Sequence, residues 1–201
     1  MLQSLFVPRH AIEKSKTVPS PLVWGMYGII GISVLFFSMK GAHMGRSINI
    51  SYIFLISALV GPIVGFFAGY ITSYIYYKIS DSFFFVPEET NRQDIFRAMA
   101  IANLPLVLLG VFTLVQYLVY GDIIFNKINP VKFMEETSSV YYYGIEALKI
   151  GVMLWVLIFT LLVLSKLLDI KIMQALLANA VCGLIIYGLG KILLYILVLS
   201  L

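Results

Sequence analysis

The sequence has little charge and few of the side chains that build metal or disulfide sites. Only 12% of its 201 residues are charged and 61% are hydrophobic, whereas about 25% of a soluble domain is charged. This composition excludes a water-soluble globular domain and predicts an all-α, polytopic membrane helical bundle. The chain has one cysteine, Cys182, and two histidines, His10 and His43. A disulfide framework or a cysteine-based metal site is therefore not expected.

Patterns typical of nucleic-acid binding and of catalysis are missing as well. No basic patch is interleaved with aromatic residues, and neither a P-loop nor a Gly-x-Ser-x-Gly motif occurs. The segment Glu88-Glu89-Thr90-Asn91-Arg92 approaches the Glu-Glu-x-x-x-Arg motif of a membrane protease family, but its arginine falls one residue early. No Asp or Glu is expected deep within a span. We therefore expect no enzymatic activity, no cofactor, no metal and no nucleic-acid partner, and a solvated loop around Glu88 and Glu89.

Apolar runs predict five transmembrane helices. A helix rising ~1.5 Å per residue needs about 20 apolar residues to cross a ~30 Å hydrocarbon core. The predicted spans, which form one membrane domain over residues 21–201, are residues 21–39, 50–77, 95–120, 147–168 and 172–195. Residues 1–20 are expected to be a cytosolic segment that lies in the interface or serves as a basic anchor. Residues 191–201 either continue the last helix or fold along the interface.

The distribution of Lys and Arg between the spans predicts the orientation. Eight basic residues fall on the side of the N-terminus and five on the other side, with Lys191 near the last exit. The first group is Arg9, Lys14, Lys16, Lys78, Arg92, Arg97, Lys166 and Lys171, and the second is Lys40, Arg46, Lys127, Lys132 and Lys149. This bias favours a cytosolic N-terminus and a C-terminus outside.

The second span carries Gly61, Gly65 and Gly69, which is the G-x-x-x-G pattern twice in register. Glycines four residues apart lie on one helix face, so another backbone can approach closely. We expect this face to pack within the molecule, or else to form a homo-oligomer contact. Tyrosines near the end of the span predict an interfacial aromatic belt, formed by Tyr70, Tyr74, Tyr76 and Tyr77.

The third span contains an amide and a proline, Asn103 and Pro105. Pro105 removes a backbone donor, so a kink is expected near Ile101, either in a plain packing helix or in a hinge or polar relay. Asn103 and Asn179 should lie at similar depths because spans three and five run in the same direction. We hypothesise that the two amides meet and hydrogen-bond, with Gln174 as a further partner; alternatively each is satisfied elsewhere.

The order of these features resembles the Yip-domain family, whose members are named for interaction with Ypt/Rab GTPases, and is most similar to its prokaryotic members. The matching segments are Leu5-Phe6-Val7-Pro8, Pro21-Leu22, the glycine-rich second span, Arg97-Ala98, Ala102-Asn103-Leu104-Pro105-Leu106 and Trp155. The resemblance covers nearly the whole chain. It implies a five-span bundle with a cytosolic N-terminus, located in the cytoplasmic membrane if the protein is prokaryotic.

The resemblance also implies a class of function. Eukaryotic relatives serve vesicle traffic and membrane shaping, and prokaryotic members are sometimes linked with exporters or envelope stress. This sequence has no long N-terminal region and no Asp-Leu-Tyr-Gly-Pro motif before the first span, which argues against a GTPase partner. The prediction is a non-enzymatic membrane scaffold or adaptor that binds lipid or other membrane proteins, exporter subunits or its own copies included. The alternative is a small transport component, either a permease or an accessory subunit of an exporter.

Overall fold

The computed structural model describes the backbone of residues 7–41, 49–84, 91–125 and 139–199 and the side chains of residues 7–40, 49–82, 91–125 and 140–185. Every secondary-structure element in these ranges is a helix. In chain order the elements are α1 (Pro8–Thr17), α2 (Ser20–Gly41), α3 (Ile50–Phe84), α4 (Arg92–Asn103), η3 (Leu104–Leu106), α5 (Val107–Tyr120), η4 (Gly121–Phe125), α7 (Ser139–Leu167) and α8 (Ile172–Leu199). The expectations for Leu5, Phe6, Glu88 and Glu89 lie outside the described residues.

Within the part of the chain that the structure describes, four helical stretches are long and apolar enough to cross a membrane. They are Ser20–Lys40, Ile50–Ser82, Arg92–Phe125 and Val140–Leu167. These stretches correspond to the first four predicted spans, and the apolar helix Ile172–Ile185 begins where the fifth span was expected. The prediction of an all-helical protein with several apolar, membrane-length helices is therefore confirmed.

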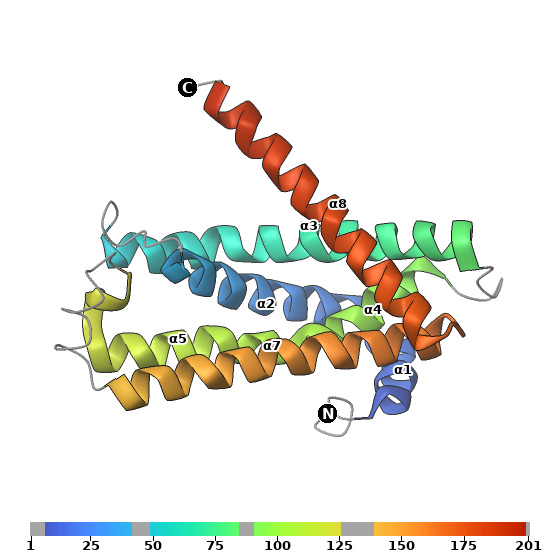
Figure 1. Ribbon diagram of the computed structural model, residues 1–201, viewed down its shortest axis with the longest axis horizontal. Coiled ribbons are helices and arrows are strands. Elements are labelled where there is room, and N and C mark those ends of the chain that lie inside the picture. The colour runs from blue at the N-terminus through green and yellow to red at the C-terminus, as the bar shows by residue number, and fades with distance from the viewer. Residues whose placement is uncertain (1–6, 42–48, 85–90, 126–138, 200–201) are drawn as a thin grey trace.

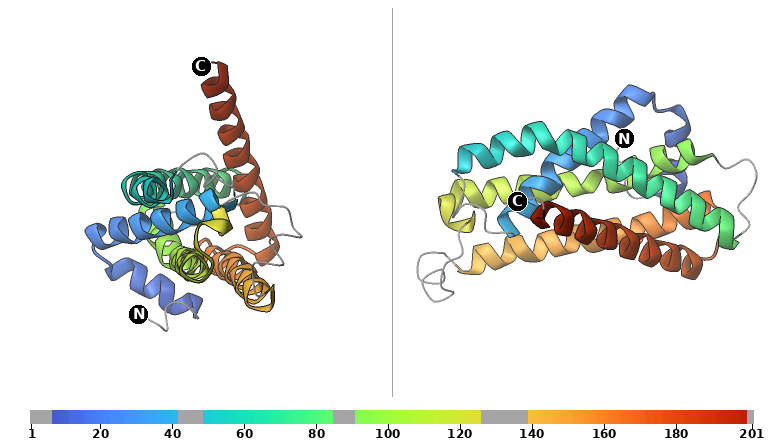
Figure 2. Two further views of the ribbon diagram at one scale, coloured as in Figure 1. Left: turned by 90° about the vertical axis from the view of Figure 1, so that its left-hand side faces the viewer. Right: turned by 90° about the horizontal axis from the view of Figure 1, so that it is seen from above.

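The long helices form a bundle from which α8 diverges. In Figure 1, α2, α3, α5 and α7 run side by side along the long axis, whereas α8 crosses them obliquely. The C-terminal end of α8 projects beyond the other helices in the left view of Figure 2. Over its first half α8 contacts α7 and α3. The divergence of α8 matters because it leaves one face of the bundle partly uncovered.

α3 and α7 extend furthest beyond their predicted spans. α3 continues for seven residues past the predicted end at Tyr77, and α7 begins eight residues before the predicted start at Ala147. Helical hydrogen bonding does not stop where the apolar residues stop, so hydropathy alone underestimates both helices. As a correction, Glu146 lies inside α7 and Lys40 lies in the last turn of α2, rather than in the connections between spans.

Pro105 interrupts the third span, as expected, but the distortion lies later than Ile101. α4 ends at Asn103, and one turn of 3₁₀ helix follows before α5 begins. Because Pro105 has no N–H, the Ile101 carbonyl cannot receive the usual bond from four residues ahead. The Leu104 N–H donates to the Ile101 carbonyl instead, which produces the tighter turn.

The glycines of α3 lie directly against α2. An alanine Cβ placed at Gly61 would be 2.6 Å from the Cα of Ile32, and one at Gly65 would be 2.8 Å from the Cα of Gly31. A Cβ at Gly69 would enter the ring of Tyr27. The glycine face is thus occupied within the molecule, where it allows the backbones of α2 and α3 to touch.

α1 packs across α4 and α7 at the end of the bundle where the α7–α8 turn also lies (Figure 1). Pro8 occupies its first turn, where a missing N–H costs nothing. Ala11 and Ser15 are completely buried against the bundle. The interfacial location of this segment stays a prediction.

Candidate functional site

The divergence of α8 creates a cavity of about 550 Å³ along the bundle. Its walls come from α2, α3, α4, η3, α7 and α8 and are mainly apolar. Val64 of α3 and Leu157 of α7 are its exposed margins, with 45% and 39% of their surface accessible. Cys182 of α8 lines its deeper, buried part. We refer to this cavity as the α8 groove; its exposed margins lie part-way along α3 and α7.

A polar patch lies within this apolar groove. The Tyr76 hydroxyl of α3 donates to Oδ1 of Asn179 on α8, and Asn103 lines the same groove from the end of α4. Thr160 of α7 is 4% exposed, and its Oγ1 has no hydrogen-bond partner among the described residues. A buried hydroxyl without a partner is costly, and in a groove it favours a ligand that carries a hydrogen-bonding group.

The two predicted amides, Asn103 and Asn179, line the same groove, as their matched depth suggested, without forming a hydrogen bond to each other among the described contacts. Asn179 is paired with Tyr76 instead. Gln174 points elsewhere: its Oε1 accepts a 2.8 Å bond from the backbone N–H of Lys171 at the start of α8. Gln174 is therefore a helix-capping residue and not a part of the polar patch.

Other predicted residues frame the groove without supplying its chemistry. Pro105 is buried in η3, beside Leu106, which lines the groove. Gly65 and Gly69 also line it, on the side where α3 touches α2. Their contribution is to bring α2 and α3 together into one continuous wall.

A second polar feature lies in the interior, between α2, α5 and α7. Lys40 Nζ donates to Gln116 Oε1 at 2.7 Å and to Glu146 Oε1, while Lys149 Nζ donates to the same two oxygens. Gln116 Nε2 completes the cluster with a 2.9 Å bond to Glu146 Oε1. Lys149 and Gln116 are completely buried. Two ammonium groups thus share one carboxylate and one amide, and they tie three helices together.

Aromatic rings supply part of the remaining compensation for this positive charge. Lys40 Nζ lies 4.8 Å from the ring centroid of Tyr142, and Lys149 Nζ lies 5.4 Å from that of Phe37. Both distances fall within the range of cation–π attraction. The cluster was missed because Glu146 was assigned to a loop. A usable signal existed, since Glu146 and Lys149 are three residues apart and therefore share a helix face.

Comparison with protein-family models, curated proteins and solved structures gives no match for this chain.

Proposed function

We propose that this protein is a non-enzymatic integral membrane adaptor that holds a lipid acyl chain in the α8 groove. The observation that carries the proposal is the groove itself, which combines apolar walls, exposed margins at Val64 and Leu157, and a buried hydroxyl without a partner. The resemblance to the Yip-domain family supports the same class of protein. Adaptor here means that the lipid-bound form contacts other membrane proteins or further copies of the chain.

The size of the groove favours a lipid chain over a transmembrane helix as its occupant. A helix about 10–12 Å wide and 30 Å long occupies on the order of 2,500 Å³. The groove offers about 550 Å³, within the range of roughly 300–1,000 Å³ that is typical of small-molecule sites. One acyl chain is a slender apolar ligand of suitable volume. A partner helix would instead contact the outer faces of the bundle.

The polar patch fits the part of a lipid that joins chain and headgroup. The Thr160 hydroxyl and the Asn103 amide both line the groove, and each can form a hydrogen bond with an ester carbonyl or a hydroxyl of the lipid. Hydrogen bonds of this kind in a membrane protein are worth on the order of 0.6 kcal/mol, and up to ~2 kcal/mol. These hydrogen bonds orient the lipid, whose affinity comes mainly from the packing of its acyl chain against the apolar walls of the groove.

The proposed topology has five spans, with the N-terminus in the cytosol and the C-terminus outside. The backbone of α8 comprises 28 residues, which corresponds to ~42 Å of helix and exceeds a ~30 Å hydrocarbon core. An oblique helix of this length reaches across the bilayer. The excess of basic residues at the end that holds α1 supports the orientation.

Lipid co-purification tests the groove. Leu157→Trp places an indole at the margin of the groove, whereas Ile158→Trp adds the same group on the adjacent residue, which is 57% exposed and does not line the groove. We expect the Leu157 variant to retain several-fold less lipid per protein by quantitative mass spectrometry, with the Ile158 variant close to the unmodified protein. Equal lipid retention in the two variants would contradict the proposal.

Affinity purification from the native membrane in mild detergent tests the adaptor role. We expect either that a membrane protein co-purifies at a fixed stoichiometry or that the chain is isolated as a homo-oligomer. The amount of this complex should fall in Leu157→Trp but not in Ile158→Trp. Recovery as a monomer without any protein partner would contradict adaptor function while leaving lipid binding intact.

A small transport component is the second candidate, and two observations favour it. The helix break at Leu104–Leu106 lies beside the groove, and the cluster of Lys40, Glu146 and Lys149 places ionisable groups inside the bundle. Broken helices and buried charges are features of transport pathways. Reconstitution into liposomes tests this candidate: a solute or proton flux that Lys149→Met abolishes would favour transport over the adaptor.

A further inference from the structure

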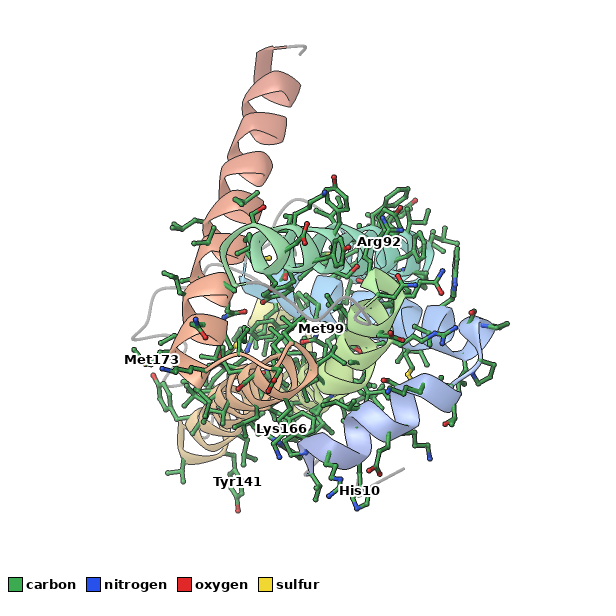
Figure 3. The ribbon with its side chains drawn as sticks, turned by 90° about the vertical axis from the view of Figure 1, so that its right-hand side faces the viewer. His10, Arg92, Met99, Tyr141, Lys166 and Met173 are labelled. Atoms are coloured by element: carbon green, nitrogen blue, oxygen red, sulfur yellow. The ribbon has the colours of Figure 1, made fainter. Side chains whose placement is uncertain are left out.

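A second pocket lies on the other side of the α2–α3 contact, at the end of the bundle where α1 lies. Its volume is about 340 Å³, and its walls come from α2, α3 and α4. Arg92 and Arg97 both line it, together with the hydroxyl-bearing Ser20 at the start of α2. Figure 3 looks onto this end and shows Arg92 beside α3, away from Met99 in the centre of the bundle.

The two arginines bring positive charge that the described side chains do not neutralise. No carboxylate of the described residues lies within ion-pair distance of either guanidinium. Arg97 Nη2 makes one long contact of 3.5 Å with Ser20 Oγ, and Arg92 Cζ lies 4.4 Å from the ring centroid of Tyr70. Most of their N–H donors therefore have no partner among the described residues.

The chemistry of the pocket selects an anion with several acceptor oxygens. A guanidinium presents five N–H donors in a planar fork that matches a phosphate or carboxylate in a bidentate manner. Ser20 adds a hydroxyl donor, and Gln93 adds an amide at the rim. Two guanidinium groups around one pocket favour phosphate, since its oxygens can accept from both.

The surroundings of the pocket favour a phosphate that belongs to a lipid. Trp24 lines it, is 54% exposed and stacks on Phe66 with the ring centroids 4.1 Å apart. Tyr70 forms a further aromatic wall beside Arg92. Exposed tryptophan next to arginine at the start of membrane-length helices is typical of the headgroup level of a bilayer. A soluble phosphate would gain nothing from this apolar rim, whereas a lipid places its glycerol and upper chains on it.

We propose that this pocket binds the phosphate of an anionic phospholipid headgroup through Arg92 and Arg97. The site is separate from the α8 groove and does not depend on the proposed function. Loss of one is distinguishable from loss of the other, because the two sites share no lining residue.

Native mass spectrometry of the detergent-solubilised protein with phosphatidylglycerol measures this affinity directly. The test variant is Arg92→Gln with Arg97→Gln, and the matched control is Lys166→Gln with Lys171→Gln. The control removes the same charge from exposed residues at the same end of the bundle, outside the pocket. We expect the arginine pair to lose on the order of 100-fold in affinity, about tenfold for each charge-assisted contact, and the lysine pair to remain within about twofold.

Two further measurements decide the ligand and the geometry. Arg92→Lys with Arg97→Lys keeps the charge and the fold but removes the planar fork, so about tenfold weaker binding is expected; binding equal to the unmodified protein would overturn the bidentate geometry. Millimolar inorganic phosphate should leave phosphatidylglycerol bound. Full displacement by inorganic phosphate, or equal loss in the arginine and lysine pairs, would overturn a lipid phosphate site.

Discussion

Replacement of Gly65 by alanine tests the backbone contact between α2 and α3. The new Cβ would lie 2.8 Å from the Cα of Gly31, and even closer to the carbonyl oxygen of Tyr27, whereas ordinary contacts of this kind are 3.4–4 Å. The shorter contact, with the Tyr27 carbonyl oxygen, sets the displacement, so the two helices must separate by more than about 1 Å. A gap of about 0.5–1 Å already forfeits a quarter to a half of the dispersion energy of each contact. Overpacking of this kind costs about 1–3 kcal/mol of the free energy of unfolding.

The matched control is Gly25→Ala on α2, where a Cβ would meet no atom within 4 Å. Alanine is the better helix former, so this variant should be unchanged or up to about 1 kcal/mol more stable. Both free energies can be measured by titration with sodium dodecyl sulfate in mixed micelles, followed by circular dichroism. If Gly65→Ala is as stable as Gly25→Ala, the close contact between α2 and α3 does not exist.

Two further predictions concern the polar clusters. Glu146→Gln should lower the free energy of unfolding by about 3 kcal/mol, because two buried ammonium groups lose their carboxylate. The addition of Lys149→Met should recover part of this loss. If the changes in free energy of the two single variants simply add in the double variant, the two residues do not share a cluster. Tyr76→Phe and Asn179→Leu should show a coupling of about 0.6 kcal/mol, and at most ~2 kcal/mol, in a double-mutant cycle. The corresponding cycle of Asn103→Leu and Asn179→Leu should show coupling near zero, and the opposite ranking would mean that the amides pair with each other.

Hydropathy predicted the helices well where the chain is apolar and poorly where helices continue into polar sequence. The expected first span, residues 21–39, nearly coincides with α2, because Pro19 and Pro21 fix its start. The start of α7 was placed eight residues late, since Val140 to Glu146 contains tyrosines and a carboxylate that read as a loop. A scale that measures transfer into hydrocarbon is insensitive to backbone hydrogen bonds at the ends of a helix.

The sequence predicted the depth of Asn103 and Asn179 along the bundle, but it did not predict the hydrogen-bond partner of Asn179. Counting residues from the basic ends placed Asn103 and Asn179 at one level, and both line the α8 groove. The hydrogen-bond partner of Asn179 is Tyr76, which was assigned to an aromatic belt. The periodicity of apolar residues and the composition do not reveal which face of α3 contacts α8. Tyr76 is 2% exposed, whereas its neighbour in that belt, Tyr74, is 46% exposed. Long-range contacts of this kind depend on the crossing of helices, which the sequence pattern does not encode locally.

Photo-crosslinking with a phospholipid that carries a diazirine in its acyl chain tests lipid binding in the α8 groove most directly. The labelled residues are mapped by mass spectrometry after irradiation in the native membrane. We predict labelling concentrated at Val64 and Leu157, which line the groove, over Ile63 and Ile158, which are more exposed yet lie outside it. Labelling in proportion to exposure, with Ile63 and Ile158 ahead, would contradict a lipid chain held in the groove.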